Sequence, residues 1–132
     1  DGLKVVVGTT DIHDYGKEII KTIAEQAGAT VFDLGTYVTP SEIMDTLVET
    51  EAKAVALSTY NGIALSYAQD VVEGIKKNKL DAKLLMGGLL NENLDNSALA
   101  VDVTDRIAEL GVNTDNDATK IVDGILEIYG RK

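Results

Sequence analysis

Cysteine and tryptophan are absent from this chain of 132 residues, which has one histidine and one proline. Without cysteine, disulfides, thiol catalysis and zinc–thiolate sites are excluded, and the absence fits a cytoplasmic location. No apolar run approaches the roughly 20 residues that cross a bilayer, and we find no signal-peptide pattern. The net charge of −10 repels phosphate backbones and anionic lipid. We therefore expect neither a nucleic acid nor a membrane as partner.

The remaining composition is that of a folded globular domain. Hydrophobic residues make up 45% of the chain and charged residues 26%, which is ordinary for such a domain. A chain of this length can bury a substantial core. We therefore expect a single domain over residues 1–132.

Short apolar runs alternate with helical stripes along the chain. Four strands are expected at 4–8, 30–34, 54–57 and 83–86, with a possible edge strand at Val112. Helices are expected at 15–27, from Thr39, around 64–75, at 102–110 and at 115–129. The helix after Thr39 has a Pro40 and Glu42 capping-box start, and its predicted buried stripe is Ile43, Met44, Leu47 and Val48. Residues 89–101 form a long polar connection.

Strands that alternate with helices predict an α/β fold of βαβ units. We expect a Rossmann-like, five-stranded parallel sheet in the flavodoxin-like order 2-1-3-4-5, with helices on both faces. Ligands of such sheets bind beyond the carboxyl ends of the strands, where the strand order reverses. The loops TTDIHDYG, STYNG and GG, after the first, third and fourth strands, should therefore line one crevice.

His13, in the first of these loops, has two interpretations. One is a loop imidazole that is solvated or hydrogen-bonded. The other is a metal ligand whose second ring nitrogen is held by a carboxylate, which Asp11 could supply. One histidine makes a poor zinc site, because zinc normally takes three protein ligands. A metal that arrives with its other ligands attached, as in a haem or a corrinoid, needs only one.

Other ligands of this architecture lack their signatures in the sequence. There is no G-x-G-x-x-G and no P-loop, so dinucleotide and P-loop sites are excluded. A response-regulator receiver would carry a phosphorylatable aspartate after the third strand, where this chain has Ser58. The cluster Asp115-Asn116-Asp117 lacks the rest of a calcium loop, and we interpret it as helix capping.

The residues Asp11, His13 and Gly16 match the D-x-H-x-x-G signature of cobalamin-binding domains. Ser58 matches that family's serine after the third strand, and Gly87-Gly88 match its double glycine after the fourth. The chain resembles this family over nearly its whole length, in particular the small subunit of glutamate mutase and the C-terminal domain of methylmalonyl-CoA mutase.

The resemblance implies that cobalamin binds with its own base displaced from cobalt. His13 would then be the lower axial ligand, Asp11 would orient it, and Ile12 lies between them in the same motif. Gly16, Gly87 and Gly88 would admit the displaced nucleotide tail, and Ser58 would hydrogen-bond the buried base. The chain departs from the family at Tyr60, where leucine is frequent, although a tyrosine there can still pack on the tail, and at 111–115. There we expect Asn113 and Thr114 to contact the nucleotide.

The function implied first is the cobalamin-binding subunit or domain of an adenosylcobalamin-dependent mutase, not catalytic alone, with a TIM-barrel partner that holds the substrate. The alternative in the corrinoid class is a methyl carrier, which would use methylcobalamin. A non-catalytic sensing or storage module and a domain that acts only through protein contacts also stay open.

Overall fold

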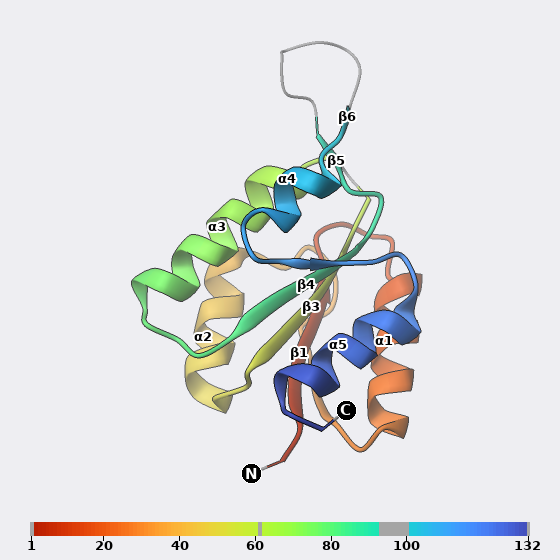
Figure 1. The fold of residues 1–132 in the computed structure, drawn as a ribbon, viewed down its shortest axis with the longest axis vertical. Helices are drawn as coiled ribbons and strands as arrows, with labels where there is room; N and C mark the ends of the chain where they lie inside the picture. Colours follow the sequence, from red (N-terminus) through yellow and green to blue (C-terminus); the bar gives the residue numbers. More distant parts are fainter. Residues whose placement is uncertain (1, 61, 93–100, 132) are drawn as a thin grey trace.

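The computed structural model describes residues 2–60, 62–92 and 101–131. Five parallel strands form one sheet in the order β2-β1-β3-β4-β7 (Figure 1). Two further strands, β5 and β6, pair as an antiparallel hairpin apart from that sheet. Because β7 is the fifth strand of the main sheet, the predicted order is confirmed. The strands are β1 (Lys4–Thr9), β2 (Thr30–Asp33), β3 (Ala54–Thr59), β4 (Lys83–Gly88), β5 (Asn91–Glu92), β6 (Val101–Asp102) and β7 (Asn113–Thr114).

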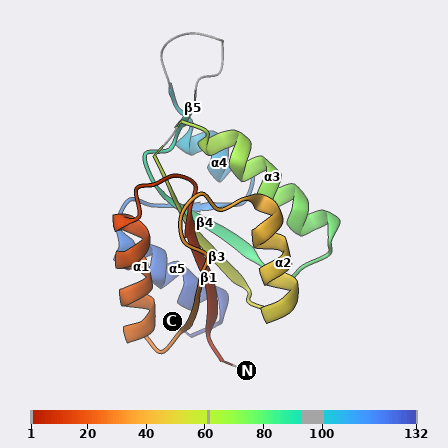
Figure 2. The same cartoon turned by 180° about the vertical axis from the view of Figure 1, so that it is seen from behind.

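Helices cover both faces of the sheet, as predicted. Figures 1 and 2 show α1 and α5 on one face, with α2 and α3 on the other, and α4 packs against α3. Among the described residues, no helix is long and apolar enough to cross a membrane. The helices are α1 (Tyr15–Gln26), α2 (Pro40–Thr50), α3 (Ala64–Lys77), α4 (Thr104–Ala108) and α5 (Ala118–Ile128).

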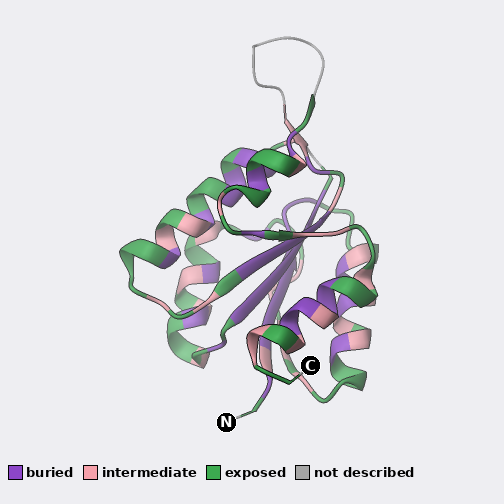
Figure 3. Cartoon of the chain, in the orientation of Figure 1, coloured by how far each residue is buried: buried purple, intermediate pink, exposed green. Residues whose placement is uncertain are grey.

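The two faces differ in the size of the strand side chains that they carry. Residues of a strand point alternately to opposite faces. On β3, Val55 and Leu57 enter the core under α2 and α3, while Ala54 and Ala56 face α1 and α5. The central strand β3 is buried along its whole length, and Figure 3 shows the middle of the sheet buried. On β3, the side chains that face α1 and α5 are therefore smaller than those that face α2 and α3.

The start of α2 is the best-predicted local feature. The Thr39 hydroxyl accepts a hydrogen bond from the Glu42 backbone N–H, and the Glu42 carboxylate accepts one from the Thr39 N–H. This reciprocal pair satisfies two backbone donors that a helix start leaves unpaired. Along the helix, Ile43 and Leu47 are buried, but Val48 is 59% exposed. The prediction that Val48 belongs to the buried stripe is therefore wrong.

Three predicted boundaries shift in the last third of the chain. α4 begins at Thr104 rather than at residue 102. The Asp102 carboxylate lies before the helix and accepts hydrogen bonds from the Thr104 N–H and hydroxyl, which pairs a free donor at the helix start. The edge strand is Asn113–Thr114, one residue beyond the buried Val112. α5 begins at Ala118, with Asp117 as its N-cap. Of the connection predicted at 89–101, residues 93–100 lie outside the described residues.

Candidate functional site

A groove of about 660 Å³ lies on the face of the sheet that carries the small side chains. Ile19, Ile20 and Ile23 of α1 line one side, and the start of α5 lines the other. Ile19 and Ile23 are only half-buried. The three loops predicted to share a crevice all contribute: Gly16, Ser58, Tyr60, Gly87 and Gly88 line this groove. An apolar, pre-formed groove of this volume suits an organic ligand.

The Asp11 carboxylate joins the loops that follow β1 and β3. Asp11 is 4% exposed. Its Oδ1 accepts a hydrogen bond from the His13 backbone N–H at 2.8 Å and lies 3.2 Å from His13 Nδ1. Its Oδ2 accepts from the Tyr60 backbone N–H at 2.7 Å. One buried acid therefore fixes both the loop that carries the histidine and the loop that carries a wall of the groove.

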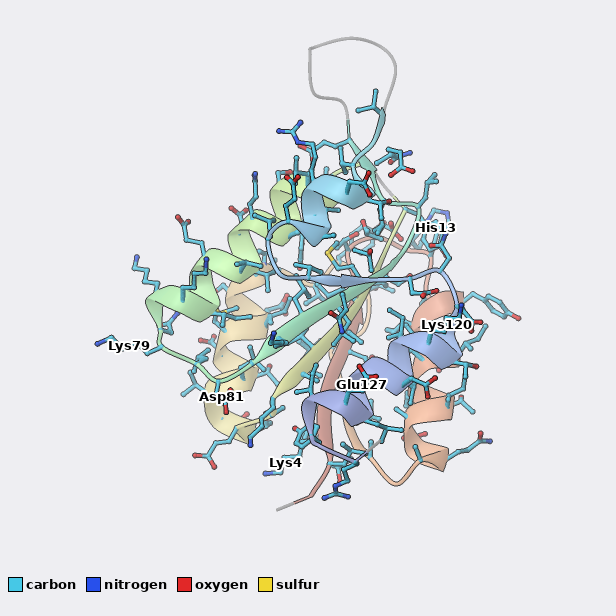
Figure 4. The ribbon with its side chains drawn as sticks, viewed as in Figure 1. Lys4, His13, Lys79, Asp81, Lys120 and Glu127 are labelled. Atoms are coloured by element: carbon cyan, nitrogen blue, oxygen red, sulfur yellow. The ribbon has the colours of Figure 1, made fainter. Side chains whose placement is uncertain are left out.

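His13 lies at the carboxyl end of the sheet, on the outside of the molecule (Figure 4). Its side chain is 66% exposed. A proton on Nδ1 can be donated to Asp11, and this tautomer leaves Nε2 unprotonated and free to bind a metal. The geometry thus matches the predicted arrangement, in which a carboxylate orients the imidazole.

Ser58 places a hydroxyl in the groove. The residue is 2% exposed, and its side chain is at the groove wall. In residues 2–60, 62–92 and 101–131, no group hydrogen-bonds this hydroxyl, whereas its backbone carbonyl accepts from Thr9 Oγ1 at 2.9 Å. The hydroxyl is accessible from the groove, so a ligand there can bond it without displacing a protein partner. The hydroxyl is thus placed to bind a polar atom of a ligand in the groove.

The three predicted glycines lie where a side chain would meet protein atoms as well as a ligand. A Cβ on Gly16 would lie 3.0 Å from Ser58 Oγ, and one on Gly87 would lie 2.7 Å from the Asp115 carbonyl oxygen. Gly88 has a φ of +105°, and a Cβ there would collide with the Thr59 backbone. The fold itself therefore requires Gly87 and Gly88, in addition to any need of a ligand.

Three other predicted residues lie away from the groove wall. Ile12 is 64% exposed and faces outward. Asn113 and Thr114 form β7 and line a different cavity, beside Gly124 of α5. In their place, residues 115–119 border the groove. The contact of Asn113 and Thr114 with the nucleotide stays a prediction, and the structure places both residues outside the lining of this groove.

Lys17 is a buried charge that the sequence patterns did not reveal. It is 3% exposed, and its Nζ lies 2.8 Å from Asp33 Oδ2 and 2.5 Å from Glu18 Oε2. Burial opposes the ammonium charge, but the hydrogen bonds to Asp33 and Glu18 outweigh it and raise the pKa of Lys17. Burial also opposes the Asp33 charge, and Lys17 nevertheless lowers the pKa of that carboxyl. This pair attaches the first turn of α1 to the end of β2.

Thr9 was also missed. It is fully buried, and its hydroxyl lies within hydrogen-bonding distance of the Ser58 and His13 carbonyl oxygens, at 2.9 and 3.3 Å. It therefore ties β1 to the groove-lining loop after β3. A threonine at the end of a β-branched run is common in strands and does not indicate such a contact. Only the three-dimensional arrangement identifies the role of Thr9.

Comparison with known proteins gives a consistent result. The family model described as the B12 binding domain matches residues 3–119. The chain is 33% identical over 88 residues to dimethylamine corrinoid protein 3 of Methanosarcina acetivorans, a match that covers 64% of this chain and 41% of the relative. The matched region is thus about two fifths of that relative's length.

Solved structures extend the likeness to almost the whole chain. A cobalamin-binding protein from Desulfitobacterium hafniense DCB-2 has a TM-score of 0.74 and 30% identity, over 98% of this chain and 58% of that one. The methanol:cobalamin methyltransferase complex MtaBC from Methanosarcina barkeri has a TM-score of 0.76 over 98% of this chain and 48% of that one, but at 18% identity it shows the fold alone. Since the family model spans residues 3–119, this chain belongs to the B12 binding domain family and is a cobalamin-binding domain.

Proposed function

We propose that this chain is the corrinoid-carrying part of a methyl-transfer system. A relative in Methanosarcina acetivorans is named a dimethylamine corrinoid protein, a name that points to a carrier of methyl groups. The methyl carrier is therefore better supported than the mutase. The cofactor we propose is a methylated corrinoid rather than adenosylcobalamin.

His13 supplies the lower axial ligand in this proposal. The observation that carries the assignment is the contact at 3.2 Å between Nδ1 and the buried Asp11 carboxylate, which leaves Nε2 exposed. A carboxylate that holds the other ring nitrogen fixes the tautomer and increases the basicity of the ligating one. Since a bound corrinoid supplies a cobalt that accepts and releases a methyl group, the basicity of this nitrogen tunes the exchange.

In this proposal the groove would accommodate the nucleotide tail of a corrinoid whose base His13 displaces. Its isoleucine walls suit the planar base, and the Ser58 hydroxyl is available for the base nitrogen. Without that bond the buried nitrogen would be unpaired, at a cost of about 1–3 kcal/mol. Gly16 keeps the region in front of Ser58 open, because any Cβ there would lie 3.0 Å from the hydroxyl.

The partner we propose is a methyltransferase chain with the TIM-barrel fold expected from the resemblance. Methyl transfer from an amine or an alcohol requires activation of that donor. In our proposal the partner performs that activation, and this domain binds, orients and presents the corrinoid.

Visible spectroscopy of the purified chain tests the ligand assignment. We expect hydroxocobalamin to bind near-stoichiometrically with an imidazole-ligated spectrum. His13→Ala should abolish that spectrum and weaken retention about tenfold or more, since the loss of supporting groups alone costs metal sites 10–100-fold. Asp81→Asn, at a 91%-exposed side chain remote from His13 in Figure 4, is the control and should bind as the parent does. Unchanged spectra for His13→Ala would reject the assignment.

A second measurement separates methyl carrier from mutase. The chain loaded with reduced corrinoid should take the methyl group of methyl iodide, with release of iodide, and pass it to a thiol acceptor. A mutase domain would instead retain adenosylcobalamin in preference to methylcobalamin in the dark. That preference, together with no methyl uptake, would overturn the methyl-carrier proposal.

A further inference from the structure

The imidazole of His13 is held by few groups. Its ring extends into solvent, with one carboxylate at Nδ1. One hydrogen bond fixes the position of a single ring atom and leaves the ring free to swing about that bond. A ligand that must present Nε2 in one direction needs a second restraint.

Tyr60 provides a ring on one side of that imidazole. The two ring centroids lie 5.9 Å apart, with the planes tilted by 60°. This separation and tilt are those of favourable aromatic pairs. The tyrosine ring therefore limits the swing of His13 on the side that faces the groove.

The backbone of Tyr60 is fixed by the acid that holds His13. Its backbone N–H donates to Asp11 Oδ2, so the same carboxylate holds the Tyr60 backbone and the His13 imidazole, while the tyrosine residue is 41% exposed. Its side chain lines the groove, and its hydroxyl lies 3.6 Å from the point that a Cβ on Gly16 would occupy. The side chain thus extends from the imidazole to the groove wall. A leucine, which is frequent here in the family, has no ring to restrain the imidazole.

We propose that Tyr60 is a positioning residue for His13, and that its ring keeps Nε2 directed outward before a corrinoid arrives. The consequence for binding rests on the proposed role of His13 as cobalt ligand, whereas the positioning itself is a property of the free chain. The aromatic pair should favour the ligating arrangement about two- to tenfold over the alternatives, the range that such pairs contribute beyond simple burial.

The free chain offers a direct test, because His13 is its only histidine. Nitrogen-15 NMR of the neutral imidazole reports the ratio of the two tautomers without overlap. We expect Tyr60→Phe to match the parent, since the ring is retained. Tyr60→Leu should lower the share of the Nδ1–H tautomer about two- to tenfold and remove the ring-current shift of the imidazole protons. Tyr37→Leu removes another exposed tyrosine, 62% exposed on a neighbouring loop, and should change neither.

The outcomes separate this inference from the proposed function. Equal tautomer ratios in the parent and Tyr60→Leu would overturn the positioning role, as would a Phe variant that behaves like the Leu variant. The amide spectrum of each variant shows whether it is folded. With hydroxocobalamin added, Tyr60→Leu should show a two- to tenfold smaller ratio of imidazole-ligated to unligated corrinoid. If the parent shows no imidazole ligation but the free variants differ as expected, the cofactor role of His13 fails and the positioning role stands.

Discussion

The two faces of the sheet are built from the same strands but have different uses. Under α2 and α3, Val55, Leu57 and Met86 are fully buried and fill the space to the helices. Under α1 and α5, the same strands present Ala56, Ser58 and Gly87, and the space that these leave is the groove. The face under α2 and α3 is filled at these positions, whereas the face under α1 and α5 has a buried core of its own, with Leu85 and Ile125, and a groove at its carboxyl end. Three pairs of substitutions test this division.

Truncation on the filled face should have the largest effect. Leu57→Ala leaves a cavity in a fully buried site and should lower the free energy of unfolding by about 3 kcal/mol. Ile23→Ala, on the half-buried groove wall, should cost about 1 kcal/mol or less, because water or a ligand can fill the space. Urea titration of both variants measures the difference. Equal losses would mean that the groove wall is as tightly packed as the core.

Loss of the Lys17 ion pair should come next. Lys17→Ala leaves Asp33 and Glu18 without their cation and should cost about 2 kcal/mol, less than a fully buried pair because both acids are partly exposed. Lys21→Ala is the matched control, since that lysine reaches the same Asp33 from a more exposed position, and it should cost less than about 0.5 kcal/mol.

The difference in the free energy of unfolding between Lys17→Ala and the parent should depend on pH in a defined way. The pKa of Asp33 is lowered from its ordinary 3.8, so its contribution is complete above that value and disappears as pH falls through the lower folded pKa. The pKa of Lys17 is raised from 10.5, so its contribution is complete below that value and disappears as pH rises through the higher folded pKa. Urea titrations from acid to alkali should show a plateau between these limits. A difference that persists at the acid extreme would assign the effect to packing instead.

Removal of the Ser58 hydroxyl should have the smallest effect on stability and a clear effect on binding. Since no described group bonds that hydroxyl, Ser58→Ala should change the free energy of unfolding by less than about 0.5 kcal/mol. It should weaken corrinoid binding about two- to tenfold, the value of one hydrogen bond. Thr9→Val removes a neighbouring hydroxyl that does have a partner, and should destabilise the free chain by about 1 kcal/mol. A Ser58→Ala variant as destabilised as Thr9→Val would show that the hydroxyl serves the fold.

The sequence predicted the elements and the end of the sheet where the site lies, because these follow from periodicity and from chain direction. The capping box at Thr39 was predictable because it depends only on neighbouring residues, and the strand order was predictable because it follows from the alternation of strands and helices. The details that depend on distant partners were missed. Lys17 looks like a surface residue of a helix, and its partner Asp33 is 16 residues away. The position of Asn113 and Thr114 beside Gly124, outside the groove lining, likewise depends on the path of the chain around β7, which has no sequence signature.

The alternation Ala54-Val55-Ala56-Leu57-Ser58 makes the site sensitive to a slip of β3 by one residue. Such a slip exchanges the two faces of a strand. It would preserve the hydrophobic content of the sheet, yet place Val55 and Leu57 under α1 and α5 and fill the groove. A misregistered chain could therefore pass a test of compactness or helix content and still hold no corrinoid. Corrinoid capture is thus a stricter measure of correct folding for this domain than stability alone.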